Sequence, residues 1–86
     1  MTQRVEVFWR DIVSDAEWHN AEVVEAVKPA MCRSMGYLRR LDKDNVLLSH
    51  TLSGGDGDYT TIPRGCVVDI FGLQRAGRID ASKGIR

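Results

Sequence analysis

The hydrophobic pattern of residues 3–10 alternates along the chain. One face carries Val5, Val7 and Trp9, and the opposite face carries Arg4, Glu6, Phe8 and Arg10. A period of two with β-branched and aromatic residues predicts a β-strand. Four later segments are rich in apolar residues and bounded by turn residues, and they also predict strands: 31–41, 46–51, 59–62 and 66–71.

The segment after the first strand predicts a helix from Asp15 to Val27. Ser14 is followed three positions later by Glu17, the spacing of a capping box, and Pro29 ends the helix because proline disfavours the α conformation in the residue before it. Residues 11–27 hold five acids and neither Lys nor Arg, so the exposed helix face is expected to be negative.

The clearest hairpin joins residues 31–41 to residues 46–51. Its turn, residues 41–45, contains Asp and Asn, which favour turns because their side chains bond nearby backbone N–H groups. Gly36 predicts a bend or bulge within the first of the two strands. Residues 63–65, Pro-Arg-Gly, predict a turn or one turn of 3₁₀ helix before the last strand.

These elements predict a mainly β fold, a small five-stranded SH3-like or Sm-like barrel with one α-helix inserted after the first strand. Curling and closing would hide the edges of such short strands. Residues 1–73 are expected to form the single domain. Residues 74–86 carry four bases and one acid and are expected to be a mobile basic C-terminal tail. The candidate core residues are Val5, Val7, Trp9, Ile12, Trp18, Val23, Val27, Leu38, Leu41, Val46, Leu48, Leu52, Ile62, Val68 and Ile70.

Length and composition limit the class of protein. The 86 residues suffice for one domain, and 12 basic against 12 acidic residues give no net charge, which argues against a strongly basic nucleic-acid module. The two cysteines are too few for a disulfide scaffold, and the N-terminus lacks the apolar stretch of a signal peptide. We therefore expect a soluble cytoplasmic protein with no membrane partner. A chain this small gains buried area by oligomerisation, which makes a homo-oligomer a live alternative to a monomer.

Few residues carry the marks of catalytic or metal chemistry. His19 and His50 have no cysteine or second histidine at metal-ligand spacing, and Cys32 and Cys66 have no local base and fit core packing, with a disulfide only if their strands pair. The glycine-rich segment 54–58 lacks both the lysine of a phosphate-binding loop and the acid spacing of a calcium loop. We expect no metal, no cofactor and no enzymatic activity.

Two other features have both a structural and a functional interpretation. Trp9 and Trp18 are expected to pack in the core, and the alternative is a stacking platform for single-stranded nucleic acid or a peptide. A basic cluster on the hairpin is either a solvated strand face or a phosphate-contact patch, and it comprises Arg33, Arg39, Arg40 and Lys43.

Residues 35–71 resemble the paired motifs of the Sm/LSm family. The first motif is matched by Gly36-Tyr37-Leu38, Asp42 and Asn45-Val46-Leu47-Leu48, and the second by Ile62-Pro63-Arg64-Gly65-Cys66-Val67-Val68-Asp69-Ile70. The sequence departs from the family in a shorter turn before Asn45, in Asp44 where a stacking residue is usual, in Pro63, and in a strand that precedes the helix.

The resemblance implies a homo-oligomeric ring that binds RNA through two loops. Asn45 and Arg64 would contact a base, Gly65 would let the base approach, and Asp42 would hold its loop. The same residues are similar to an SH3-like barrel, and the chain is also similar to short phage or prophage proteins of unknown function. The alternative expectation is therefore a phage-derived protein-interaction or structural accessory module with a protein partner and no nucleic-acid role.

Overall fold

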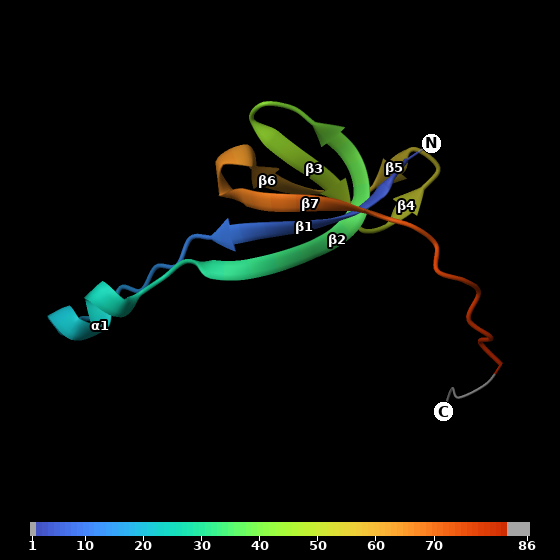
Figure 1. Cartoon of the computed structure of the whole chain (residues 1–86). Helices are drawn as coiled ribbons and strands as arrows, with labels where there is room; N and C mark the ends of the chain where they lie inside the picture. The colour runs from blue at the N-terminus through green and yellow to red at the C-terminus, as the bar shows by residue number, and fades with distance from the viewer. Residues whose placement is uncertain (1, 83–86) are drawn as a thin grey trace.

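The structure, a computed structural model, describes residues 2–82. Within that range the chain forms seven strands, one α-helix and one 3₁₀ turn (Figure 1). Their bounds are β1 (Arg4–Asp11), α1 (Ala21–Ala26), β2 (Ala30–Leu41), β3 (Asn45–Ser49), β4 (Leu52–Ser53), β5 (Asp56–Gly57), β6 (Thr60–Pro63), η1 (Arg64–Cys66) and β7 (Val67–Leu73). The mainly β class, the helix between the first two strands and the 3₁₀ turn before the last strand are confirmed.

Five strands form one antiparallel sheet in the order β6-β3-β2-β1-β7, and β4 and β5 form a separate small hairpin. The β4–β5 hairpin occupies the glycine-rich segment, which the sequence analysis did not include among the expected strands. Figure 1 shows that the five-stranded sheet is curled, with β3 and β6 lying above β1 and β2. The edge strands β6 and β7 are not hydrogen-bonded neighbours, so the sheet stays open where a closed barrel was predicted.

The hydrophobic core lies on the concave side of the curl. Its five buried apolar residues come from β1, β3 and β6, and they are Val5, Val7, Val46, Leu48 and Ile62. Trp9, Leu38 and Ile70 are half-buried against this cluster. All eight of these residues were core candidates, because strand alternation places them on the face that must leave water.

For six of the other seven candidates the core prediction is wrong, while Leu52 is half-buried. Six candidates are exposed: Ile12, Trp18, Val23, Val27, Leu41 and Val68. The first four lie in the connection between β1 and β2, residues 12–29, which we call the arm. Figure 1 shows the arm and α1 extending beyond the end of the sheet, where no strand lies close enough to cover them.

The helix is also shorter than predicted. It begins after Asn20, whose side-chain oxygen accepts a hydrogen bond from the backbone N–H of Val23 at 3.0 Å. The predicted capping box at Ser14 does not form, because the Asp15 carboxylate accepts the backbone N–H of Glu17 at 2.8 Å in a non-helical turn. An Asx turn competes with helix at this position, so the first half of the predicted helix is lost.

Gly36 is explained by a close approach between β2 and the end of β3. A Cβ atom at this position would lie 2.8 Å from the backbone oxygen of Ser49, inside van der Waals contact. The β2 bulge that was predicted at the glycine lies slightly further along, between Leu38 and Arg40. Together, the glycine and the bulge let the long strand β2 bend over the core.

The arm and the C-terminal segment make the molecule elongated. The radius of gyration is 17.6 Å, compared with about 12 Å expected for a compact domain of this length. After Leu73 the described chain has no further helix or strand up to Ser82, and Figure 1 shows this segment leaving the end of the sheet opposite to the arm. Lys83 and Arg86, two bases of the predicted tail, lie outside the described residues.

Candidate functional site

Asp42 organises the turn between β2 and β3. One carboxylate oxygen accepts the backbone N–H groups of Asp44 at 2.9 Å and Asn45 at 2.8 Å, and the other lies 2.9 Å from Nε of Arg40. The hydrogen bond from Asn45 is the main reason that the pKa of Asp42 is lowered, followed by that from Asp44. Asp42 thus holds its loop.

The two loops of the resemblance lie side by side at one end of the sheet. The backbone N–H of Arg64 donates to the carbonyl of Asp44 at 2.9 Å, and Asn45 pairs with Pro63 between β3 and β6. Arg64 and Gly65 are exposed, and a Cβ atom added at Gly65 would meet nothing within 4 Å. The structure therefore brings together all four residues that the resemblance assigned to RNA.

The predicted basic cluster is divided among separate places. Arg33 lies over the ring of Phe8, 5.8 Å from its centroid, and Arg40 pairs with Asp42. The Arg39 guanidinium donates to the carbonyl of Gly55 at 2.8 Å. Arg33 precedes Arg39 by six positions on β2, which separates their backbones by roughly 20 Å at the usual rise per strand residue. One continuous phosphate patch through Arg33 is therefore not formed.

Arg39 and Arg40 instead line a shallow groove of about 400 Å³ beside the β4–β5 hairpin. The other lining residues are Leu47, Ser49, Gly57, Asp58, Tyr59 and Thr61. Sequence analysis did not select Tyr59, whose exposed fraction is 77%, because an aromatic residue in a short strand usually packs inward. Its position beside a Gly-Asp turn was the available signal that it lies at the surface.

The groove floor is fixed by polar contacts of Asp58. One of its carboxylate oxygens accepts the backbone N–H of His50 at 2.7 Å and that of Thr51 at 3.0 Å. These two hydrogen bonds, the one from Thr51 first, lower the pKa of Asp58. Its backbone oxygen accepts the hydroxyl of buried Ser49 at 2.6 Å, which ties the small hairpin to the core.

Every residue of the arm is exposed, although the arm is rich in apolar side chains. Trp18 is 100% exposed, so its expected place in the core is wrong. Trp9 is half-buried as predicted, and its indole N–H donates to Ser34 Oγ at 3.0 Å. The two tryptophans therefore differ in role, and Trp18 is free to contact another molecule.

The tip of the arm holds three polar side chains close together. His19 Nε2 lies 2.9 Å from a carboxylate oxygen of Asp15, and one ligand atom each of Asp15, Glu17 and His19 lies within 4.8 Å of the others. The backbone N–H of Glu17 and the His19 ring lower the pKa of Asp15. All three groups are exposed, and Asp15 links the segment before α1 through its contacts with the Glu17 backbone N–H and the His19 ring.

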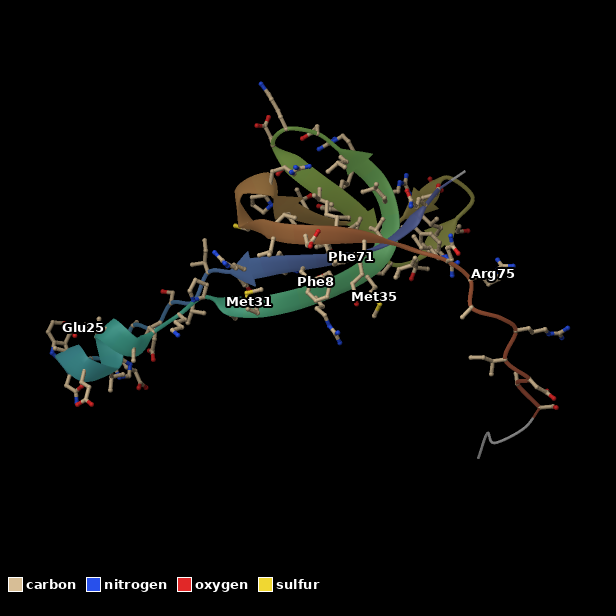
Figure 2. All side chains as sticks on the ribbon, in the orientation of Figure 1. Phe8, Glu25, Met31, Met35, Phe71 and Arg75 are labelled. Carbon is tan, nitrogen blue, oxygen red and sulfur yellow. The ribbon has the colours of Figure 1, made fainter. Side chains whose placement is uncertain are left out.

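A second exposed apolar surface lies on the convex side of β7, β1 and β2, which we call the outer face. Figure 2 shows Phe8, Met31, Met35 and Phe71 pointing away from the core on this side. The rings of Phe8 and Phe71 meet edge to face at 5.6 Å. Met31 and Met35 are more than half exposed, so the apolar surface is open to a partner.

The two cysteines are free and half-buried. Cys66 packs against the core cluster as expected. Trp9 of β1 lies between them, since it pairs with Cys32 on one side and with Val67, next to Cys66, on the other. Cys66 lies in η1, directly before β7, and β7 does not pair with β2, which holds Cys32, so the condition for a disulfide is not met.

Comparison of the chain with protein-family models, curated proteins and solved structures finds no significant match. The Sm resemblance therefore stays a prediction from the motif residues. Among residues 2–82 there is no helix with the length and apolar character needed to cross a membrane.

Proposed function

We propose that this protein is a self-assembling structural module, a homo-oligomer whose subunits join through the arm. The observation that carries this proposal is Trp18, a tryptophan 100% exposed on an arm in which every residue is exposed. Contiguous exposed apolar surface on a small domain usually marks a protein interaction site. Tryptophan is also the residue type most often found at the energetic centre of such sites.

The small core supports the same proposal. Among residues 2–82, only five apolar side chains are buried, whereas 13 large hydrophobic residues are exposed. Domains of this size have a thin margin of stability, and burial between subunits is one way to increase it. Assembly would cover side chains that the isolated fold leaves in water.

The open sheet supports an SH3-like or Sm-like relationship for the subunit. Its edge strands β6 and β7 are consecutive in the chain and are joined only by the single 3₁₀ turn η1. Further curling of the sheet would therefore bring these two edges toward each other. In this proposal the subunit is an open variant of the small barrel, and the oligomer is a ring of such subunits.

Native mass spectrometry tests self-assembly directly. The matched control replaces residues 12–29 by Asn-Gly, because Asp11 and Ala30 are paired opposite each other and a two-residue turn can join such a pair. We expect the full chain to form a defined oligomer and the arm-less variant to be a folded monomer. A full chain that stays monomeric at micromolar concentration contradicts the proposal and favours the alternative, an interaction module for a different protein.

RNA binding is the second candidate function, favoured by the contact between the two loops. Asp42 fixes the first loop, and the Arg64 N–H holds the second loop against Asp44. An exposed arginine beside an open glycine gives a strand of RNA access to both side chain and backbone. Asp44 lowers the local positive potential, so we place this function second.

Fluorescence anisotropy with a labelled single-stranded RNA of mixed sequence tests the second candidate. We expect Arg64→Ala and Asn45→Ala each to weaken binding, while Arg75→Ala, which removes a charge outside the two loops, serves as the control. Binding that is absent, or that all three variants weaken equally, contradicts an RNA site at the loops. The oligomeric state is measured on the same samples, so the two functions are judged separately.

A further inference from the structure

The arm and the outer face carry opposite charge along with their apolar side chains. The arm, residues 12–29, contains four acids and one base, Lys28, so its net charge is −3. The outer face carries three bases, Arg4, Arg10 and Arg33, and two acids, Glu6 and Asp69. Arg33 lies over the ring of Phe8 on this face. Arg10 pairs with Met31 at the end of the face nearest the arm. One chain thus presents an acidic apolar surface and an apolar surface on which bases outnumber acids.

We propose that the arm of one copy docks on the outer face of the next copy. Trp18 packs against Met31 and Met35, and the acids of the arm approach Arg10 and Arg33. This inference rests on the proposed self-assembly and names the two surfaces that meet. Flexible methionine side chains suit this contact, since they adapt to the shape of an inserted ring.

A second copy is the occupant favoured by charge. The arm has a net charge of −3 and the whole chain has a net charge of zero, so the rest of the same chain carries +3, and a pairing of arm with face reduces the charge of both without a foreign protein. Complementary potentials orient such a contact and disfavour the alternatives in which arm meets arm. Two arms placed together would bring eight carboxylates into one interface.

The contact joins two different surfaces, so it is heterologous. Each subunit offers one arm and one face, and repetition closes a ring or continues as a filament, depending on the rotation between subunits. A stable contact of standard size buries roughly 800 Å² on each partner. Trp18 alone supplies roughly 150–250 Å² of it. The other apolar side chains of the arm extend the surface, and they are Ile12, Val13, Val23, Val24 and Val27.

Mixing two defective variants tests the inference. Trp18→Ala removes the arm anchor, and Met35→Glu places an acid on the outer face; both positions are exposed, so neither change disturbs the core. We expect each variant alone to be monomeric, with self-association weakened by about 30-fold or more, as for loss of a central aromatic anchor. An equimolar mixture is expected to give a heterodimer of defined mass, because one intact arm and one intact face remain. Tyr59→Ala, which removes an exposed aromatic elsewhere, is the control and should assemble like the wild type.

Charge exchange gives a second, independent measurement. Arg33→Glu should weaken assembly because it opposes the acidic arm, and combining it with Glu22→Lys and Glu25→Lys should restore assembly. The single-tryptophan variant Trp9→Phe reports the contact by fluorescence, since Trp18 should shift to shorter wavelength as protein concentration rises.

The possible outcomes distinguish the proposed self-assembly from the proposed arm-to-face contact. Assembly of both Trp18→Ala and Met35→Glu at wild-type affinity overturns the arm-to-face contact and leaves self-assembly intact. Loss of assembly in Trp18→Ala with wild-type assembly of Met35→Glu points to arm-to-arm contact and likewise overturns it. Loss of assembly in both variants without a heterodimer in the mixture also overturns it. A wavelength shift of Trp18 that is independent of concentration means that the arm covers its own face. A wild-type chain that remains monomeric overturns the proposed function and this inference together.

Discussion

Replacing Gly36 by alanine should destabilise the sheet through one defined contact. The added Cβ would lie 2.8 Å from the backbone oxygen of Ser49, 3.4 Å from the Ser49 carbonyl carbon and 3.5 Å from Nδ1 of His50. The nearest atom belongs to the backbone, so a side-chain rotation cannot relieve the contact. Either β2 or the end of β3 has to move.

Movement at Ser49 has a further cost. This residue is buried, its hydroxyl donates to Asp58 O at 2.6 Å, and it accepts a long bond from Arg39 at 3.4 Å. Overpacking of this kind costs about 1–3 kcal/mol. The φ angle of Gly36 is not positive, so the substitution also recovers about 0.4–1 kcal/mol by restricting the unfolded chain. We expect a net loss of about 1–2 kcal/mol.

Gly65→Ala is the matched control for Gly36→Ala. Its φ angle is also not positive, and nothing lies within 4 Å of an added Cβ. The same chemical change should therefore be neutral or stabilise by up to about 1 kcal/mol. Urea unfolding followed by circular dichroism, in the arm-less background at fixed protein concentration, measures both variants free of assembly. Equal stability of the two variants would show that the approach of β2 to Ser49 does not constrain residue 36.

Three further predictions follow from the core and its hydrogen bonds. Leu48→Ala should cost about 2–5 kcal/mol because Leu48 is 0% exposed, whereas Leu41→Ala, at an exposed position, should cost much less in the same urea titration. Trp9→Phe should lower the free energy of unfolding by about 0.5–1.5 kcal/mol more than its loss of apolar area explains, because it removes the hydrogen bond to Ser34. A double-mutant cycle with Ser34→Ala that gives no coupling energy would contradict this. The pKa of Asp58 is lower in the folded protein than its unfolded value of about 3.9. The contribution of Asp58 to stability is therefore complete above the unfolded pKa and is lost as the pH falls through the folded pKa. The difference in unfolding free energy between wild type and Asp58→Asn should narrow below pH ~4. A gap that is constant from neutral pH to acid would refute that role.

The sheet could be predicted from the sequence because its signals are local. Alternation in residues 3–10 identifies Val5 and Val7 as core residues, and the Asp42–Asn45 turn fixes the hairpin between β2 and β3. The prediction of a turn at residues 63–65 was sufficient to place Arg64 near the hairpin end once the strands paired. The proximity of Arg64 to the Asp42–Asn45 turn, which forms the candidate RNA site, could therefore be predicted from the sequence.

The arm and the basic cluster were harder because they depend on long-range geometry. Apolar spacing in residues 15–27 indicates that side chains should leave water, but it does not say which surface covers them. The competition between the Asp15 turn and a helix start at Ser14 is decided by small differences in local hydrogen bonding. Likewise, the bulge between Leu38 and Arg40 changes which way the arginines of β2 point, and no residue in that sequence fixes its position.

The attachment of the arm has a consequence for how this protein can change over evolutionary time. The arm leaves the sheet at Asp11 and returns at Ala30, which are paired opposite each other, and none of its residues is buried. Selection for a stable fold therefore does not constrain mutations between these two positions. Related chains can keep the same sheet while their arms drift in length and charge, and each new arm with a matching face would define a separate set of subunits that recognise only one another.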